Sequence, residues 1–261
     1  MLNQMRIDID RNKLLESIHI YSEREKKEKD NIRRFLKEKN FNMVGFNYSG
    51  LVENERKIAL EKYALGKPIN EVKKHFRRAA QYAEELANIQ IKTNTFYQGW
   101  LTMDAVYGAI ISDEVDLAKR IARNIKTYLD LTSFDEELHP FGVSTTNALR
   151  NFILENDEKA VEEISNIKVD KAGEGIEFYY QGQLYRALIE RDVDLVEENL
   201  GELLKRHDNQ VKWGWLKGMP EGYFCIPSVA LTKLARQRGL EVKVEEIPEK
   251  LRKYLPMELI E

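Results

Sequence analysis

The stretch AIISDEVDLAKRI, residues 109–121, contains an apolar helix end, a short acidic turn and the beginning of a second amphipathic helix. The same form recurs in FILENDEKAVEEI (152–164) and in LIERDVDLVEENL (188–200). One apolar position recurs at separations of 43 and 35 residues, as Leu117, Ala160 and Leu195. Such periods are typical of stacked helical hairpins. The sequence therefore predicts an all-α fold of stacked antiparallel hairpins, a repeat-like helical bundle without the tetratricopeptide consensus.

The composition agrees with a helical protein. Of the 261 residues, 43% are hydrophobic and 33% are charged, with 14 glycines and 6 prolines. A β-sandwich of this size would need more glycine and proline for its turns. One segment, LEVKV (240–244), alternates with period two and predicts a short extended tail. The length fits one extended helical domain or two closely packed halves.

The N-terminal region predicts a long charged helix over residues 10–39, where apolar positions recur at helical spacing. The next segment, NFNMVGFNYSG (40–50), contains two glycines and predicts a connection. A second helix is expected from about Val52 to Leu65, before glycine and proline stop signals. We therefore divide the chain into an N-terminal charged helix with its connection, residues 1–45, and an all-helical domain, residues 46–261.

The charge pattern and the apolar segments bear on partners and compartment. In the long charged helix the lysines alternate with acids, so no basic stripe forms and we expect no nucleic-acid partner. No window approaches the roughly 18 uncharged apolar residues of a membrane span, so we expect no membrane partner. The N-terminus lacks the apolar region of a signal peptide, and the single cysteine, Cys225, excludes an intramolecular disulfide. These features predict a cytoplasmic protein.

Two Glu-x-x-His pairs, Glu16 with His19 and Glu136 with His139, have the spacing found in di-iron helical bundles. Glutamate is so frequent in this chain that chance supplies such pairs. Pro140 directly follows the second pair, where a helix does not readily continue. No further glutamates can be assigned to facing positions. We therefore expect no metal site.

Other signs of catalysis are weak. Cys225 lies between Phe224 and Ile226, an apolar setting that raises the pKa of a thiol and keeps it unreactive. The glycine-rich AGEG at 172–175 lacks the lysine and the strand–helix context of a phosphate-binding loop. No Gly-x-Ser-x-Gly nucleophile elbow is present. We expect neither an enzyme nor a cofactor.

Acidic residues are concentrated in the middle of the chain. Residues 101–206 hold 22 acidic and 12 basic residues, although the net charge of the whole chain is only −3. Such a region is a candidate for meeting a basic partner. The alternative is that each acid only caps its own helix and favours the helix dipole. The candidate partner-binding residues are the acids of the three turns: Asp113, Glu114, Asp116, Asp157, Glu158, Asp192 and Asp194.

The most organised stretch is PEGYFCIPSVALTKLARQRGL, residues 220–240. It predicts a turn, an extended run over residues 223–226, and a helix that Ser228 caps and Gly239 ends. Leu231, Leu234 and Ala235 are expected in the core. The basic side chains are expected to face solvent: Lys233, Arg236 and Arg238.

The Pro-Glu-Gly-Tyr turn, the Ile-Pro-Ser step and the run ALTKLARQRGLEV resemble the C-terminal hallmark of the immunity protein 49 family, most clearly over residues 215–245. Members of that family are all-helical bacterial proteins that protect a cell against its own polymorphic toxins. The resemblance implies an immunity protein that binds a cognate toxin domain and blocks its active site or substrate channel, without catalysis. Because many such toxins act on nucleic acid through basic clefts, it also implies that the acidic turns face such a cleft.

An alternative function is a helical-repeat interaction module that binds a peptide or a regulatory protein. The oligomeric state is left open by the sequence.

Overall fold

The computed structural model describes residues 10–93, 99–131, 140–167 and 175–261, and these residues form helices and no strand. The all-α prediction is confirmed. None of the described helices combines the length and apolar character that crossing a bilayer requires. The helices in chain order are α1 (Arg11–Lys37), α2 (Phe41–Ala64), α3 (Ile69–Thr93), α4 (Gly99–Ile111), α5 (Val115–Leu131), α6 (Pro140–Ile153), α7 (Asp157–Ser165), α8 (Ile176–Glu190), α9 (Val193–Trp213), the 3₁₀ turn η1 (Pro220–Gly222), α10 (Ile226–Gln237), η2 (Val244–Glu246), α11 (Glu249–Arg252) and α12 (Met257–Ile260).

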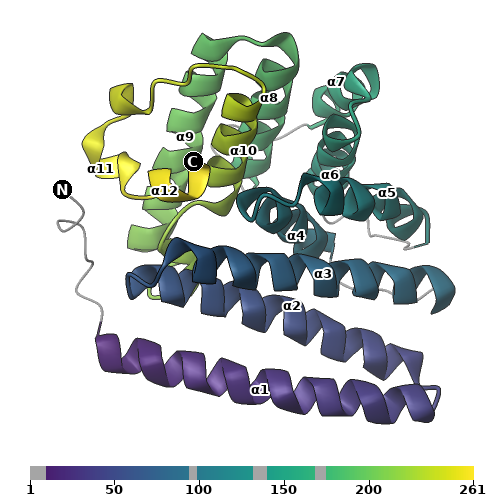
Figure 1. The fold of residues 1–261 in the computed structure, drawn as a ribbon. Coiled ribbons are helices and arrows are strands. Elements are labelled where there is room, and N and C mark those ends of the chain that lie inside the picture. Colours follow the sequence, from purple (N-terminus) through teal and green to yellow (C-terminus); the bar gives the residue numbers. More distant parts are fainter. Residues whose placement is uncertain (1–9, 94–98, 132–139, 168–174) are drawn as a thin grey trace.

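The helices form two parts that meet at α3 and α4 (Figure 1). The long helices α1, α2 and α3 lie side by side as one layer, and α8, α9 and α10 stand across it. Helix α4 contacts α3, α5 and α10, so it joins the layer to the rest of the molecule. The short helices α11 and α12 pack on α9 and α10. One large apolar core extends from α2 to α12.

The three predicted hairpins are present as α4–α5, α6–α7 and α8–α9, each with its turn at the predicted acidic segment. The predicted alignment is wrong at its third position, because Leu195 is 37% exposed. The equivalent buried positions follow each turn by the same distance and are Ala118, Ala160 and Val196. The periodic apolar pattern therefore marks the core-facing side of each second helix, with the first and third positions moved on by one residue.

The predicted connection over residues 40–50 is wrong, because α2 begins at Phe41 and runs through it. The break in the chain is confined to a tight turn, where Lys39 has φ 55° and the Asn40 side chain accepts the N–H of Met43 at 3.3 Å. A Cβ at residue 50 would lie 2.2 Å from Oε1 of Glu28 on α1. Gly50 thus makes room for a side chain of the neighbouring helix and does not break its own.

Helix α10 is largely buried, with nine of its twelve residues buried. Leu231, Leu234 and Ala235 lie in the core, as predicted. The helix ends at Gly239, whose φ is +76°, and the N–H of Leu240 donates to the carbonyl of Ala235 at 3.0 Å. This is the Schellman arrangement that the sequence predicts.

The start of α10 differs from the prediction. Residues 223–226 do not form an extended run, because η1 precedes them and α10 already begins at Ile226. Pro227 lies in the first turn of the helix, where its missing N–H would have no intrahelical acceptor. Ser228 is therefore inside the helix, and its hydroxyl donates to Sγ of Cys225 at 3.0 Å instead of capping the backbone.

The segment LEVKV forms no strand, since Val244 begins the 3₁₀ turn η2. Burial does alternate along the segment, as the sequence pattern predicts: Leu240, Val242 and Val244 are buried, whereas Glu241 and Lys243 are exposed. No strand lies beside it among the described residues to form a ladder. An alternating pattern therefore predicts which side faces the core and not the hydrogen-bonding partner.

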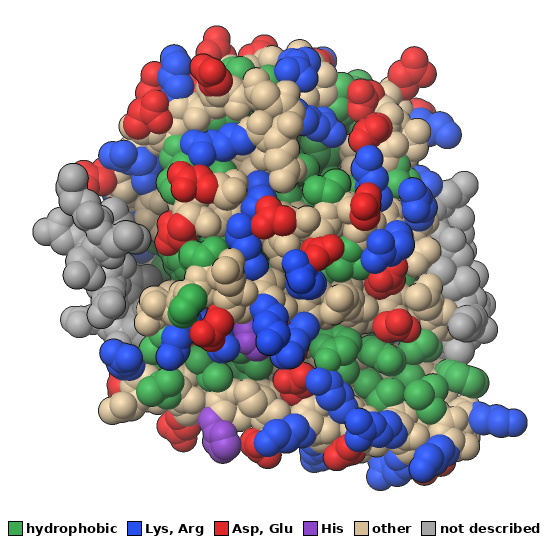
Figure 2. All heavy atoms as spheres, viewed as in Figure 1, with side chains coloured by type: hydrophobic (Ala, Val, Ile, Leu, Met, Phe, Trp, Pro, Cys, Tyr) green, Lys and Arg blue, Asp and Glu red, His purple; other side chains and the backbone are tan. Residues whose placement is uncertain are grey.

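Helix α1 packs on α2 mainly through polar contacts, and only Leu14, Ile32 and Phe35 are buried on α1. A small apolar cluster holds the far end of the pair, and hydrophobic side chains gather on the visible face between α1 and α3 (Figure 2). Three hydrogen bonds also join α1 and α2: Ser17 to Glu61 at 2.6 Å, Asn54 to Glu28 at 2.8 Å and Asn31 to Asn47 at 3.1 Å.

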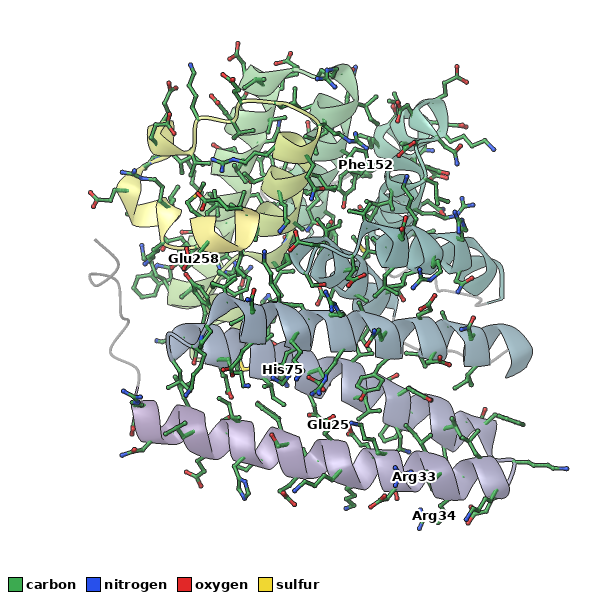
Figure 3. All side chains as sticks on the ribbon, viewed as in Figure 1. Glu25, Arg33, Arg34, His75, Phe152 and Glu258 are labelled. Atoms are coloured by element: carbon green, nitrogen blue, oxygen red, sulfur yellow. The ribbon has the colours of Figure 1, made fainter. Side chains whose placement is uncertain are left out.

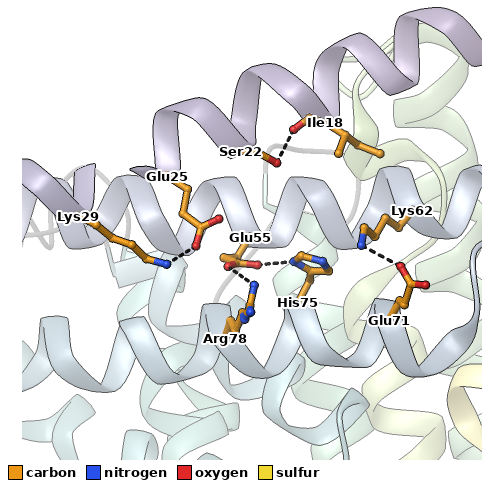
Figure 4. Close-up of polar contacts among 9 residues, drawn as sticks. All are labelled: Ile18, Ser22, Glu25, Lys29, Glu55, Lys62, Glu71, His75 and Arg78. Carbon is orange, nitrogen blue, oxygen red and sulfur yellow. Dashed lines mark hydrogen bonds and ion pairs between the residues drawn. The ribbon is translucent and has the colours of Figure 1, made fainter. Parts of the chain in front are cut away.

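The polar contacts continue into α3 (Figure 4). Glu55 of α2 is completely buried and pairs with Nδ1 of His75 and, at 3.4 Å, with Arg78 of α3. Glu25 of α1 pairs with Lys29 at 2.5 Å and points toward α2 (Figure 3). Arg33 and Arg34 lie on the outer side of α1 (Figure 3). Buried charges need such partners, because removing a charge from water is costly.

Two carboxyl groups, one on α1 and one on α2, have strongly raised pKa values. Burial raises the pKa of Glu28 to about 7, and burial likewise raises the pKa of Glu61 to about 7, although the bonds from Asn54 and Ser17 oppose the shifts. The folded protein therefore binds more protons at these groups than the unfolded chain between about pH 4.5 and about pH 7. Their contribution to stability is fully present below that window and is lost as the pH rises through about 7.

We expect Glu28→Gln and Glu61→Gln each to flatten the fall in the free energy of unfolding between about pH 5 and about pH 8. The amide cannot ionise, so it does not become costly to bury when the pH rises. Urea unfolding at a series of pH values measures the slope.

The control is Glu23→Gln on α1, because Glu23 is exposed and pairs only at the surface with Lys26. It should leave the slope of the wild-type protein unchanged. If the two buried variants also keep the wild-type slope, these carboxyl groups are not protonated in the folded protein near neutral pH.

Candidate functional site

The three acidic turns share one backbone geometry. Each contains a residue other than glycine in the left-handed region: Asp113 (φ 66°), Glu155 (φ 61°) and Arg191 (φ 57°). The N–H of the next residue then donates to the carbonyl five positions earlier, at 2.8 Å from Glu114 to Ala109, 2.8 Å from Asn156 to Asn151 and 2.9 Å from Asp192 to Ala187. This closure satisfies carbonyls at the helix end and turns the chain within two or three residues.

The carboxylates of the first turn are paired with neighbouring helices. Asp113 contacts Lys73 of α3 at 2.9 Å and Lys233 of α10 at 2.5 Å. Partial burial raises the pKa of Asp113, but the hydrogen bonds from these two lysines outweigh it and lower the pKa below its usual value. Glu114 contacts Arg77 of α3 at 2.7 Å. The first turn thus fastens α3 and α10 to the α4–α5 hairpin.

Of the other five candidate acids, one caps a helix and four are exposed. Asp192 is the N-cap of α9 and accepts the N–H of Leu195 at 3.0 Å, so it has the capping role. The remaining four are exposed: Asp116, Asp157, Glu158 and Asp194. The structure therefore separates the seven predicted residues into three with contacts inside the protein and four with side chains at the surface.

All three turns lie against α10. Lys233 pairs with Asp113 of the first turn, and the C-cap residue Arg238 lies over Phe152, just before the second turn, and contacts the third turn. Arg191 of the third turn donates to the carbonyl of Arg238 at 2.9 Å. Burial lowers the pKa of the Arg238 guanidinium, and the charges of Asp157 and Glu155 in the second turn oppose this effect. The acidic turns are thus brought together by one basic helix, which partly neutralises them.

The prediction that Lys233 faces solvent is wrong, since the residue is only 1% exposed. Its ammonium donates to the carbonyls of Ile111 at 3.4 Å and Leu259 at 3.2 Å and pairs with Asp113. Carbonyls at helix C-termini carry partial negative charge and suit a cation. Burial lowers the pKa of Lys233, and the hydrogen bond to Asp113 opposes this shift.

The other two basic residues of this stretch differ from each other. Arg236 is exposed, as predicted, whereas Arg238 is half-buried with its guanidinium 4.3 Å from the ring centre of Phe152. An arginine can cover an aromatic face in this way because its guanidinium is planar and weakly hydrated. Helical spacing alone does not reveal such a contact.

A cavity of about 290 Å³ lies among α2, α4, α8, α9 and the beginning of α10. Its walls are mostly apolar and include Met103, Phe178, Leu203, Phe224 and Ile226. Trp215 also lines the cavity and is 66% exposed, so it marks the side that opens to the surface. An apolar pocket with a few convergent polar groups is the usual form of a binding site.

The polar groups of the cavity centre on Arg56. Its guanidinium contacts Oδ2 of Asp104 at 2.7 Å and Oε1 of Glu221 at 2.8 Å. Burial raises the pKa of Asp104, and the positive charge of Arg56 opposes that shift. One cation is thus shared by two acidic side chains. Oε2 of Glu221 is buried and has no hydrogen-bond partner within the described part of the chain.

Two further groups of the cavity wall are held in their neutral forms. Burial lowers the pKa of His207 to about 4, so its imidazole is uncharged at neutral pH, and it packs edge-on against Tyr254. Burial raises the pKa of the Cys225 thiol to about 11. Since the thiolate is the reactive form, this thiol is a poor nucleophile at neutral pH. Cys225 is buried in the core, as predicted.

Sequence reasoning did not find this cavity, although one signal was present. The run WGWLKGMPEG, residues 213–222, has two tryptophans in a glycine-rich turn at the beginning of the stretch that resembles a known family. Trp213 is 83% exposed and Trp215 is 66% exposed. Tryptophan side chains this exposed are uncommon in a protein that has a core to receive them.

The Glu-x-x-His pairs do not form a metal site in the described residues. Glu16 and His19 are both exposed on α1, and Glu136 with His139 lies outside the residues that the structure describes. Within the described ranges, no three His, Cys, Asp or Glu residues are arranged to hold a metal ion.

Comparison with known proteins adds one finding. The model of the protein family described as immunity protein 49 matches residues 58–259. No curated protein and no solved structure shows a significant match. The matched segment begins inside α2 and ends inside α12, so it contains the three hairpins, α10 and every part of the cavity wall except Arg56.

We expect Lys233→Ala to lower the free energy of unfolding by about 2–5 kcal/mol, because it removes a packed stem and leaves buried carbonyls without their donor. Lys73→Ala is the matched control, since Lys73 pairs with the other oxygen of the same Asp113 carboxylate and its side chain is 18% exposed, against 2% for Lys233. It should cost about 0–1 kcal/mol. Chemical denaturation measures both, and equal losses would show that the ammonium of Lys233 is not buried in the folded protein.

Proposed function

The chain belongs to the immunity protein 49 family, and from that premise we propose that it is a bacterial immunity protein that binds and neutralises a cognate polymorphic toxin. The observation that carries this proposal is the family match over residues 58–259, which includes most of the chain. The toxin domain is bound directly, and the bound protein covers the toxin's active site or its substrate channel.

This function requires binding and no chemical step. The cavity fits that requirement, because the thiol of Cys225 in its wall is protonated at neutral pH. We propose that the protein acts by stoichiometric binding in the cytoplasm, where a toxin directed against the producing cell must be blocked. We also propose that residues 1–45, which include α1, are an N-terminal addition to the all-helical domain of residues 46–261.

We propose further that the acidic turns form part of the surface that faces the toxin. Four of the seven turn acids have exposed side chains, which supports this role: Asp116, Asp157, Glu158 and Asp194. A basic cleft on the toxin is attracted to such an edge, and charge complementarity mainly speeds association. Asp113 and Glu114 stabilise the fold and contribute only through the field of the edge.

The edge and the cavity lie at opposite ends of α9, the first at Asp192 and the second at Gln210. A helix of this length spans about 30 Å, which is about the diameter of a small domain. One toxin domain can therefore contact both, and the two surfaces make different contributions that experiments can separate.

We expect co-expression of this protein to restore growth of cells that produce the toxin domain encoded beside its gene, and we expect the two proteins to copurify at equal stoichiometry. Analytical size exclusion with mass determination checks the complex. A protein that restores growth without forming a complex would act by another route, and a protein that binds only an unrelated peptide or regulator would support the interaction-module alternative.

We expect reversal of the exposed turn acids, as in Asp157→Lys with Glu158→Lys or in Asp194→Lys, to slow association with the toxin domain by roughly tenfold at low salt. The difference from the wild-type protein should shrink at high salt, because screening removes long-range attraction. Stopped-flow kinetics at two ionic strengths measures this. Glu23→Lys on the outer part of α1 is the control, and unchanged rates in all turn variants would place the interface elsewhere.

A further inference from the structure

We propose that the cavity beside Trp215 receives one basic side chain, an arginine or a lysine, of the bound toxin domain. This inference rests on the proposed function and specifies where and by what chemistry the toxin is anchored. It concerns a different surface from the acidic turns and depends on different residues.

The charge at the cavity floor favours a cation. Arg56 lies between the carboxyl groups of Asp104 and Glu221, at 2.7 Å and 2.8 Å, so one positive charge faces two acidic groups. Glu177 adds a further carboxylate to the lining, opposed by Arg206. An incoming carboxylate would meet Asp104, Glu177 and Glu221, whereas an incoming ammonium or guanidinium would complete the pairing of the floor.

An unsatisfied acceptor marks the position of the missing donor. Glu221 is only 9% exposed and uses Oε1 to bind Arg56, while its Oε2 has no hydrogen-bond partner among the described residues. A buried carboxylate oxygen without a donor is costly, and a charge-assisted hydrogen bond is the strongest way to satisfy it. An apolar side chain in the cavity would leave this oxygen unpaired. A side chain with N–H groups at its tip satisfies it.

The walls suit the stem of a long basic side chain. Met103, Leu203 and Phe224 give the cavity apolar sides above a charged floor. Arginine and lysine have this same division, with an aliphatic stem and a charged end, and they bury the stem against apolar surface where the end finds a partner. The cavity is therefore complementary to such a residue along its whole length.

The mouth of the cavity adds a second contact for a cation. Trp215 is 66% exposed and lines the opening, so its ring can lie against a guanidinium or ammonium that passes it. Tryptophan is the best aromatic partner for a cation and is enriched among residues that dominate binding energy. Trp213 is 83% exposed but does not line the cavity. The two tryptophans therefore provide a matched pair of variants.

The experiment measures the affinity of the toxin domain for four variants by isothermal titration calorimetry. Trp215→Ala should weaken binding about 30-fold or more, and Glu221→Gln should weaken it about tenfold or more. Glutamine keeps an oxygen for Arg56 but replaces the free acceptor by a donor. The controls are Trp213→Ala and Glu198→Gln on the exposed side of α9, which should change the affinity less than threefold, that is, by less than about 0.7 kcal/mol.

A second measurement identifies the partner residue. Each exposed arginine and lysine of the toxin domain is replaced by alanine and tested against the wild-type protein and against the Trp215→Ala and Glu221→Gln variants. One basic residue should lose most of its effect in these backgrounds, because its contacts are already absent. If every basic residue of the toxin has the same effect in all backgrounds, the inference is wrong. Trp215 is on the surface, so its variant decides the matter even if Glu221→Gln does not fold.

The outcomes separate this inference from the function on which it rests. If the wild-type protein does not bind the toxin domain at all, the proposed function fails. If the wild-type protein binds and both cavity variants bind equally well, immunity by binding stands and the cavity does not anchor the toxin. Loss of affinity without coupling to any basic residue would also overturn the inference, since another kind of group would then occupy the cavity.

Discussion

The buried ammonium of Lys233 is the contact on which the second part of the molecule depends. It lies where α4 and α12 end, and it meets a carbonyl of each together with the carboxylate of the first acidic turn. A charge in this position is tolerated because two carbonyls and one carboxylate accept from it. The position of α10 is therefore fixed by a polar requirement at its centre as well as by the apolar residues around it. The turns of all three hairpins are then arranged along this one helix. The carbonyl of Arg238 at its end accepts from Arg191 of the third turn, and the guanidinium of Arg238 is attracted by the acids of the second turn.

Much of this architecture could be predicted from the sequence because it depends on local rules. Backbone preferences, which a few neighbouring residues determine, produce the end of α10 at Gly239 and the three acidic turns. The polar interiors could not be predicted in the same way. Lys233 and Glu55 look like surface residues in the sequence, and they are buried because distant segments supply their partners. Gly50 looks like a helix breaker, and it lies inside α2 because the carboxylate of another helix occupies the space beside it.

The candidate site shows the same division. The acids of the turns were visible in the sequence because they recur at similar positions, and the structure adds which of them already have partners. The cavity was not visible, because Arg56, Asp104 and Glu221 come from three separate elements and meet only in the folded chain. Only the exposed tryptophans near residue 215 gave a sign of it. The proposed function unites the two surfaces, since an acidic edge and an acidic cavity floor both suit a basic partner.

Amide hydrogen exchange of the protein, alone and saturated with its toxin domain, tests most directly whether the toxin binds the face that holds the cavity. Exchange reports the protection of each segment without any substitution, and it distinguishes a covered surface from an uncovered one. We expect the strongest new protection in residues 203–227, which include the end of α9, η1 and the start of α10, with weaker protection at the three acidic turns. Protection confined to α1 and the outer side of α2, with residues 203–227 unchanged in the complex, would contradict this account.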